Sequence, residues 1–492
     1  MRVYALWALV AALSAYAWRD WFKSLCGLIL LMAVMQHQDM PKTVMGIQGL
    51  NPWNILMVSV VLAWLVSRQR ECLKWDMPRH FSGLLLTYLG IILIGFMRMI
   101  EDRSHLEHLT TTSLISEQLL NTLKWVIPGA LLFDGCRTSQ RLRLAILSLL
   151  SLYLLLALQV AREIPLISLL EQSQEVARLR LRRCQRLGYS ACDMSTMLAG
   201  ASWAMVACLP LCRARWAKVL IGGIALLTAY SQALTGGRAG YMAWAGVGLT
   251  LCFLKWRKFL LLAPVVPILL FAFFPGTTQR VFQGFGVVDV AGNATVDHSI
   301  ATSDRTLLWP YVVDRITDSP AIGYGRLAMD RTGFATWLGA QIGETYSHPH
   351  NAYLEWLIDN GIIGFIPVMA FLGLVVYCSA KLFRDREPWC ATGGGIALSL
   401  VLAQLLGGIG AQHFYPGEST VGMWAAIFLM LRVWTARSRL SPLAAHGLPP
   451  GPTTPGHSRV LSRAWSGTVP RTVGGVQLLE PRQAAQERQR TP

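Results

Sequence analysis

The sequence has little charge: 14% of its 492 residues are Asp, Glu, Lys or Arg, whereas soluble globular chains carry about 25%. Hydrophobic residues make up 53%, and the mean hydropathy is +0.42. These figures exclude a disordered chain, a fibrous chain and an ordinary cytosolic enzyme, and they indicate a polytopic membrane protein. The sequence also lacks a Cys-x-x-Cys pair and any zinc-like spacing. Its ten cysteines are expected to be mostly buried free thiols, with a disulfide between Cys184 and Cys192 as the alternative.

Acidic residues are scarce relative to basic ones, with 27 Asp and Glu against 44 Lys and Arg, which gives a net charge of +17. An excess of this size fits a nucleic acid, a membrane surface or an anionic substrate, so the positions of the charges must decide. The concentrated basic stretches fall partly outside the predicted cytoplasmic side and lack interleaved aromatic residues. No nucleic acid is therefore expected as a partner.

Apolar segments of roughly 17–25 residues, long enough to span a bilayer, recur along the chain. They predict an all-α polytopic membrane protein with about 12 (12–13) transmembrane helices, near 3–18, 22–36, 51–67, 80–99, 117–133, 142–161, 191–212, 216–235, 238–254, 258–275, 361–380, 391–411 and 420–436. The first segment, which follows Arg2 and contains Ala15-Tyr16-Ala17, has a signal peptide as its alternative.

Lys and Arg in short loops predict the orientation, because such residues collect on the cytoplasmic side. Two predicted spans separate each basic loop from the next, so one side holds the basic residues of 68–79, 137–143, 213–218, 255–258 and 381–386. We predict that this side is cytoplasmic. The resulting organisation is transmembrane helices 1–10 in 1–275, with a periplasmic loop at 162–190; a large periplasmic loop at 276–360, with helices near 304–316 and 350–360; C-terminal transmembrane helices in 361–436; and a disordered basic cytoplasmic tail at 437–492.

Five arginines lie within residues 178–186, in a loop that this topology places outside, where the positive-inside rule disfavours them. Two explanations need no function: the topology is shifted by one span, or the segment is an amphipathic helix on lipid head groups. The functional explanation is an anion site, because the planar guanidinium binds phosphate oxygens through two hydrogen bonds at once. We predict that Arg182, Arg183 and Arg186 bind a lipid diphosphate.

Two further arginines are expected at the same side of the membrane. Arg238, in Thr-Gly-Gly-Arg, begins a predicted span, and the glycines permit a tight turn there. Arg305, in Ser-Asp-Arg, begins a predicted helix. Their structural alternatives are an interfacial arginine that extends towards water and an Asp–Arg pair. The functional prediction is that both stabilise negative charge on a substrate.

His348 and His350 flank a proline just before a predicted amphipathic helix. A histidine titrates near neutral pH, so it can act as a general base or donate a hydrogen bond to phosphate. Two histidines alone make a poor metal site, and the nearby acids are Glu344 and Glu355. We therefore predict no metal and no cofactor.

Taken in order, these motifs resemble the O-antigen ligase family, whose superfamily also holds O-antigen polymerases and protein O-oligosaccharyltransferases. The resemblance covers roughly residues 50–436 and rests on Arg-Leu-Gly at 186–188, Thr-Gly-Gly-Arg at 235–238, Ser-Asp-Arg at 303–305, Gly-Tyr-Gly at 323–325 and His-Asn-Ala-Tyr-Leu-Glu from 350, followed by Asp-Asn-Gly-Ile-Ile-Gly from 359. The chain departs from the family at Cys-Asp-Met-Ser, 192–195, where many members have Pro-Asn, and in its long basic tail.

The resemblance implies a GT-C-type glycosyltransferase of the bacterial inner membrane with its active site on the periplasmic face. It implies an inverting, metal-independent transfer of a glycan from undecaprenyl diphosphate to a hydroxyl, in ligases a lipid A-core sugar. The family's functional residues match Arg186, Arg238, Arg305 and His350 here. Polymerase and protein O-oligosaccharyltransferase activities stay open. A small-anion transporter is a lower alternative, because the candidate charges gather at one edge instead of the bilayer midplane.

Overall fold

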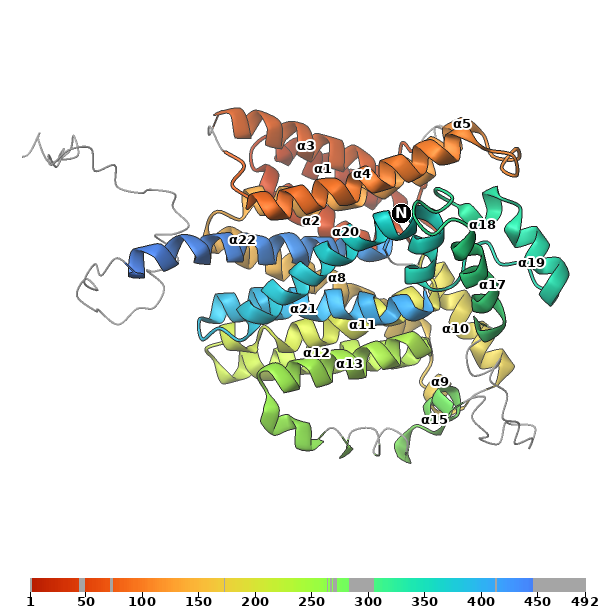
Figure 1. Ribbon diagram of the computed structural model, residues 1–492. Helices are drawn as coiled ribbons and strands as arrows, with labels where there is room; N and C mark the ends of the chain where they lie inside the picture. Colours follow the sequence, from red (N-terminus) through yellow and green to blue (C-terminus); the bar gives the residue numbers. More distant parts are fainter. Residues whose placement is uncertain are drawn as a thin grey trace, which may run out of the picture.

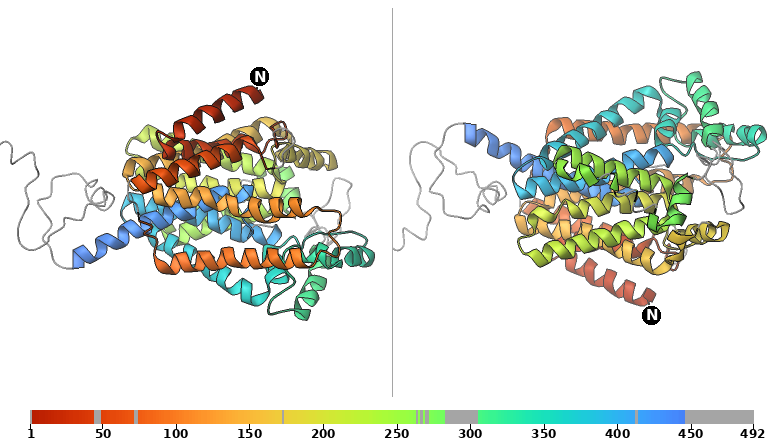
Figure 2. Two further views of the ribbon diagram at one scale, coloured as in Figure 1. Left: turned by 90° about the horizontal axis from the view of Figure 1, so that it is seen from above. Right: turned by 90° about the horizontal axis from the view of Figure 1, so that it is seen from below.

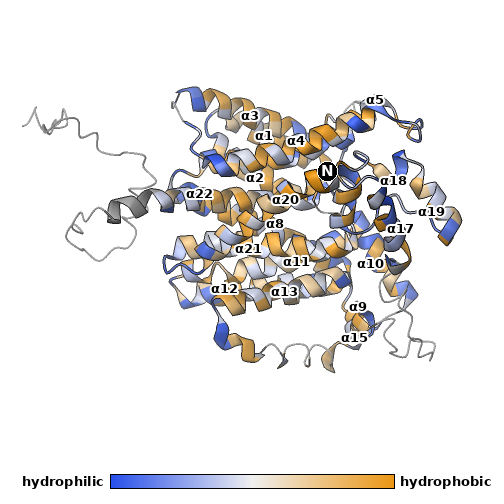
Figure 3. Ribbon diagram, viewed as in Figure 1, coloured by the Kyte–Doolittle hydropathy of each residue, from blue (hydrophilic) through white to orange (hydrophobic). Residues whose placement is uncertain are grey.

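The computed structural model describes residues 2–43, 49–70, 74–171, 173–262, 264–265, 268, 272–282, 305–411 and 414–445. This part of the chain contains helices and no strand, and its long helices lie side by side in one bundle (Figure 1). The all-α prediction is confirmed for these residues. Hydrophobic residues occupy the middle of the bundle, and hydrophilic residues gather at its two ends (Figure 3).

The first half of the described chain forms α1 Arg2–Ala17, α2 Trp21–Met35, α3 Pro52–Arg70, α4 Arg79–Glu101, a broken helix from α5 Thr111–Leu114 through α6 Asn121–Leu123 to α7 Ile127–Gly135, α8 Ser139–Glu163, α9 Ile167–Leu170, α10 Gln174–Arg186 and α11 Ala191–Val206. The second half forms α12 Arg215–Thr235, α13 Arg238–Leu254, α15 Pro275–Phe282, α17 Arg305–Asp318, α18 Ala328–Arg331, α19 Phe334–Ile342, α20 Ala352–Phe383, α21 Pro388–Gly407 and α22 Val421–Ala445.

Seven helical segments of the described residues are long and apolar enough to cross a bilayer: Arg79–Glu101, Ser139–Glu163, Ala191–Leu211, Arg215–Thr235, Ala352–Phe383, Pro388–Gly410 and Glu418–Ser438. Two shorter apolar helices, Val3–Ala17 and Trp21–Met35, accompany them. A polytopic membrane protein is therefore supported, whereas the total of 12–13 spans stays a prediction. The span expected at 258–275 falls partly outside the described residues, and its described beginning, Arg257–Leu262, is a 3₁₀ helix instead of an α-helix.

The C-terminal helices form the centre of the bundle. In α22, 94% of the apolar window is buried, whereas in α12 the figure is 28%. The outward face of α12 carries Trp216, Val219 and Leu226, all largely exposed. Large apolar side chains on such a face are expected where lipid replaces water as the solvent.

The basic loops meet at one end of the bundle, which we call the basic end. Lys255 donates from Nζ to the carbonyl oxygens of Phe383 (2.8 Å) and Asp385 (2.9 Å), and Arg437 pairs with Asp385 at 2.6 Å. The opposite end carries α10, α15 and α17–α19, and we call it the cap end. The N-terminus lies at the cap end, whereas α22 ends at the basic end (Figure 2). The predicted gathering of basic loops on one side is thus observed.

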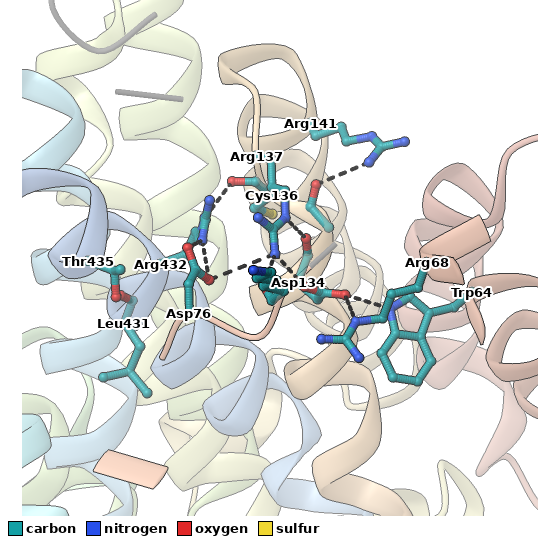
Figure 4. A network of polar contacts seen from close by, with 12 residues as sticks. Trp64, Arg68, Asp76, Asp134, Cys136, Arg137, Arg141, Leu431, Arg432 and Thr435 are labelled. Atoms are coloured by element: carbon teal, nitrogen blue, oxygen red, sulfur yellow. Dashed lines mark hydrogen bonds and ion pairs between the residues drawn. The ribbon is translucent and has the colours of Figure 1, made fainter. Parts of the chain in front are cut away.

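A buried ionic network ties helices together at the basic end (Figure 4). Asp134 of α7 is fully buried and accepts hydrogen bonds from Arg68 Nε (3.0 Å), Arg137 Nη2 (2.6 Å) and Trp64 Nε1 (2.9 Å). Next to it, Arg432 of α22 donates from Nη1 to both carboxylate oxygens of Asp76 at 2.8 Å. The network therefore joins α3, α7 and α22 through charges that water screens poorly.

Replacing Asp134 with alanine is expected to destabilise the protein by about 3 kcal/mol, the lower part of the range for a broken buried ion pair. The lower part applies because Arg68 and Arg137 stay partly exposed (27% and 21%) and can regain some hydration. Thermal unfolding of the purified protein in detergent measures the effect. The matched control is Asp318→Ala, which removes a surface pair with Arg315 and should change stability by less than about 1 kcal/mol. Equal shifts for the two variants would contradict the role given to Asp134.

The C-terminal boundary of the predicted transmembrane region lies within α22. α22 continues to Ala445, so residues 437–445 of the expected disordered tail are helical. This corrects the prediction for those residues, and the rest of the tail lies outside the described residues.

The helices expected near 304–316 and 350–360 are present as α17 and the beginning of α20. Gly361 interrupts α20 with φ 60° and ψ −172°, and the 320–325 segment crosses this kink, with Ile362 N donating to Pro320 O at 2.9 Å. A side chain at Gly361 would collide with Ala321 O, 2.3 Å from an ideal Cβ, so only glycine fits this crossing.

Candidate functional site

A glycine turn places Arg238 at the start of α13, at the cap end. Gly236 ends α12 in the left-handed conformation (φ 68°), which favours glycine. An ideal Cβ on Gly237 would lie 2.7 Å from Ser195 Cβ of α11, and Ser195 Oγ donates to Gly237 O at 3.1 Å. The turn is therefore pressed against α11, and this contact fixes where Arg238 emerges.

Arg305 reaches the same region from the first residue of α17. Its Nη2 donates to Gly410 O at 2.8 Å, at the C-terminal end of the α21 segment. Its Nε is buried without a hydrogen-bond partner among the described residues. Arg305 is thus held on one side and keeps donor capacity on another.

The two arginines belong to a larger cationic cluster, which we call the arginine cluster: Arg180, Arg238, Arg280 and Arg305. The charges of Arg280 and Arg305 act on Arg238, and all three lie within electrostatic range of the Cys192 thiol at the start of α11. Arg280, from α15, donates from Nε to Gly236 O at 3.3 Å. Like charges are thus drawn together from α13, α15 and α17, an arrangement that favours an anion.

The sequence did not identify Arg180 and Arg280 as site residues. Arg180 of α10 is 3% exposed, and its Nη1 would lie 2.7 Å from an ideal Cβ on Gly236, so it packs directly against the glycine turn. Burial lowers the pKa of the Arg180 and Arg280 guanidinium groups, and the positive charge of another arginine of the cluster lowers each pKa further. The helical spacing of Arg180, Cys184 and Leu187, all buried, is the signal that would have separated Arg180 from the exposed arginines of α10.

The histidine segment lies beside Arg305. His350 has φ 50°, a left-handed conformation that is unusual for a residue with a side chain. Its backbone N donates to His348 Nδ1 at 3.3 Å, and the two ring centroids are 4.0 Å apart. Trp309 of α17 donates to Pro349 O at 3.0 Å, and Asn351 caps α20 by accepting from the N–H groups of Tyr353 and Leu354. These contacts fix the segment on both sides of His350.

The environment disfavours the protonated form of both imidazoles. Burial, followed by the charge of Arg305, lowers the pKa of His350 below 6.5. Burial, followed by His350 and then Arg305, lowers the pKa of His348 to about 4. Arg305 therefore connects the histidines to the arginine cluster electrostatically.

The acids near the histidines have other partners. Glu355 and Asp359 of α20 face Arg326 at 3.2 and 3.5 Å, Tyr415 donates to Asp359 at 2.8 Å, and the guanidinium of Arg326 lies 3.5 Å from the Tyr415 ring centre. Among the described side chains, no three His, Cys, Asp or Glu residues are grouped so that they would hold a metal ion. The Arg326 network instead anchors the cap to α20, and metal independence stays a prediction.

The structure separates the predicted site residues into two groups. Arg238, Arg305, His348 and His350 come together. Arg182, Arg183 and Arg186 lie on another face of α10, where Arg183 pairs with Glu163 at 2.9 Å and Arg186 with Asp39 at 3.7 Å. The alternative disulfide is absent, because Cys184 and Cys192 are both free thiols.

Comparisons with known proteins bear on the region that contains this site. Residues 223–369 match the model of an O-antigen ligase family, and this range holds Arg238, Arg280, Arg305, His348 and His350. The chain is 30% identical over 177 residues to the exopolysaccharide production protein ExoQ of Rhizobium meliloti (strain 1021), an alignment that covers 34% of this chain and 40% of the relative. The chain thus matches less than half of that relative's length. The matched domain and the relative support the resemblance seen in the sequence: residues 223–369 are similar to the O-antigen ligase family.

Proposed function

We propose that the protein is a glycosyltransferase of the bacterial inner membrane that transfers a glycan from undecaprenyl diphosphate to an acceptor hydroxyl. The acceptor that we propose first is a lipid A-core sugar. The convergence of Arg180, Arg238, Arg280 and Arg305 beside His350 is the observation that supports this proposal most strongly.

The arginines suit the departure of a diphosphate. As the bond between the anomeric carbon and the diphosphate oxygen breaks, negative charge grows on that oxygen. Fixed cations that are already half buried stabilise this charge, most effectively where little water screens them. Arg238 and Arg305 have the central role in our proposal, and Arg180 and Arg280 add charge from α10 and α15. The N-terminus of α13, where Arg238 begins the helix, adds a partial positive charge.

His350 suits the acceptor side of the reaction. A lowered pKa leaves its imidazole neutral, the form that can accept a proton from the attacking hydroxyl. A neutral imidazole can also donate one hydrogen bond to a phosphate oxygen. Both roles use the neutral imidazole that burial and the charge of Arg305 favour.

The position at the cap end suits a lipid-linked donor. The arginine cluster lies at the ends of apolar helices, so a polyprenyl chain would run along the bundle within the bilayer while its diphosphate stays at the cluster. Since the basic end is predicted to be cytoplasmic, the transfer would take place on the periplasmic face. No metal is part of the proposal, because the arginines supply the positive charge.

A second candidate function is polymerisation of a glycan. The relative in Rhizobium meliloti is named for exopolysaccharide production, which favours a growing polysaccharide as the acceptor instead of lipid A-core. The same arginines and the same base would serve, because the two reactions differ only in the hydroxyl that attacks. Transfer to protein hydroxyls is a third outcome.

Deletion of the gene, followed by electrophoresis of the lipopolysaccharide and analysis of lipid-linked glycans, tests the proposal. A ligase predicts loss of long chains and accumulation of polymer on undecaprenyl diphosphate. Single-repeat material would instead indicate a polymerase, and unglycosylated proteins would indicate the third outcome. If all glycans remain unchanged, the proposed function is wrong. In a membrane assay of the complete protein, transfer is expected to persist in excess chelator.

A further inference from the structure

Three arginines of α10, Arg182, Arg183 and Arg186, line a pocket of about 840 Å³. One wall is the C-terminal half of α10, and the other is the segment from Gln36 to Lys42 that follows α2. α10 lies at the cap end of the bundle, beside the ends of α11 and α12 (Figure 1). The pocket and the arginine cluster therefore share one helix but use different sides of it.

The shape of the pocket depends on a close contact between its two walls. Gly188, just after α10, has φ 90°, and an ideal Cβ there would lie 1.9 Å from Gln36 O. Gln38 N donates to Arg186 O at 2.8 Å, which joins the segment to the last turn of the helix. Lys42 Nζ donates to the carbonyl oxygens of Met35 and Gln36 at 2.9 and 3.0 Å. These contacts fix the positions of the groups that line the pocket.

The pocket is strongly basic. Lys42, Arg182, Arg183 and Arg186 line it together with three glutamines, and none of the described residues that line it is acidic. Glu163 and Asp39 compensate part of this charge, through Arg183 at 2.9 Å and through Arg186 at 3.7 Å. Glu418 also acts on Lys42, so four cations face three carboxylates and a net positive charge remains on the described walls. Arg186 is 44% exposed and loosely paired, so its guanidinium is accessible to a ligand.

We propose that this pocket is a second anion site, separate from the arginine cluster, and that it binds a phosphate monoester carried on a membrane lipid or on a glycolipid sugar. A phosphate monoester carries up to two charges and three oxygens that accept charge-assisted hydrogen bonds, which matches arginine forks and glutamine amides. The position at the end of the apolar bundle places the pocket where the head group of a lipid would lie.

A purely structural role for the arginines of the pocket is the alternative to ligand binding. Arg183 and Arg186 occupy the last turn of α10, where positive side chains stabilise the helix dipole without any ligand. That explanation predicts a change in stability and no change in phosphate binding. Binding must therefore be measured directly, on folded protein.

The test uses the full chain with Arg182→Gln and Arg186→Gln combined, which keeps the Arg183–Glu163 pair. The matched control combines Arg178→Gln and Arg162→Gln, two exposed arginines at the same end that do not line the pocket, so both proteins lose the same charge. Thermal unfolding in detergent first establishes that both variants are folded. The probes are glucosamine 1-phosphate and inorganic phosphate, by calorimetry, and phosphatidic acid in phosphatidylcholine nanodiscs.

The pocket variant is expected to raise the Kd at least about tenfold, whereas the control changes it less than about twofold, because a lost charge-assisted hydrogen bond corresponds to about a tenfold factor. Binding of glucosamine 1-phosphate identifies a sugar phosphate as the source, and binding of phosphatidic acid alone identifies a phospholipid; both support the proposal. Equal losses in the two variants, or binding of inorganic phosphate alone, would overturn it.

The test is independent of glycan transfer. Arg238→Gln is expected to leave binding of these probes within about twofold. If Arg238→Gln abolishes it, the probe occupies the arginine cluster and the second site is refuted. If transfer itself is absent from the protein, the pocket proposal still stands or fails on its own measurement.

Discussion

Replacing His350 with asparagine is expected to slow glycan transfer by about 10²–10⁴-fold, the usual cost of losing a general base. Asparagine is the informative replacement because it tolerates the left-handed backbone of this position (φ 50°), so the segment keeps its shape while the imidazole is lost. Transfer from undecaprenyl-diphosphate-linked glycan, measured under single-turnover conditions in membranes, isolates the chemical step.

The matched control for this variant is His105→Asn, which removes an exposed histidine at the cap end, between α4 and α5, whose ring lies beside Gly333. Its rate should stay within about twofold of the unmodified protein. A near-normal rate for His350→Asn would refute the role of this side chain as a base.

The pH dependence offers an independent check on the same residue. His350 must be neutral to accept a proton, and burial and Arg305 both lower its pKa below 6.5. The acidic limb of kcat/KM is therefore expected below pH 6.5. Removing the charge of Arg305 raises the pKa of His350, so Arg305→Gln should move this limb to higher pH. An unmoved limb would mean that another group titrates.

Replacing Arg305 with glutamine is expected to lower kcat by about 10²–10³-fold, as when one donor to a developing oxyanion is removed. Arg305 is the sharpest test of the diphosphate site, because its charge acts on Arg238, on Cys192 and on both histidines. Lysine at this position keeps the charge but loses the planar fork, so Arg305→Lys should retain an intermediate rate.

Arg315→Gln provides the control on the same helix. Arg315 pairs with the exposed Asp318 at 3.2 Å, and its loss should leave kcat nearly unchanged. Equal rates for Arg305→Gln and Arg315→Gln, in proteins with similar thermal stability, would exclude Arg305 from the reaction.

Much of the fold could be predicted because the signals are local. Apolar runs identified the helices of the bundle, and short basic loops identified the end at which they meet. The motifs around Arg238, Arg305 and His350 were also sufficient to predict residues that the structure brings together from α13, α17 and the start of α20. These segments lie far apart in sequence, and the family resemblance, which the matched domain supports, linked them.

The rest depends on tertiary contacts that spacing does not encode. Arg280 carries no motif and is recognisable only because α15 brings it to Gly236. The arginines of α10 looked like one group in the sequence. In the structure Arg180 is buried, whereas Arg182, Arg183 and Arg186 lie on another face of the helix and line the pocket. The extension of α22 to Ala445 was missed because polar residues follow Trp434 while the helix continues past the contact of Arg437 with Asp385.

The ion pair between Asp76 and Arg432 bears on how the protein is assembled. The two residues are separated by 356 positions, so Asp76 enters the membrane region long before its partner is synthesised. Until α22 is made, the described charge partner of Asp76 at this end is Arg137, whose Nη2 lies 3.8 Å from the carboxylate. The bidentate pair therefore forms only after α22 has reached the basic end, so completion of the network is coupled to the synthesis of α22.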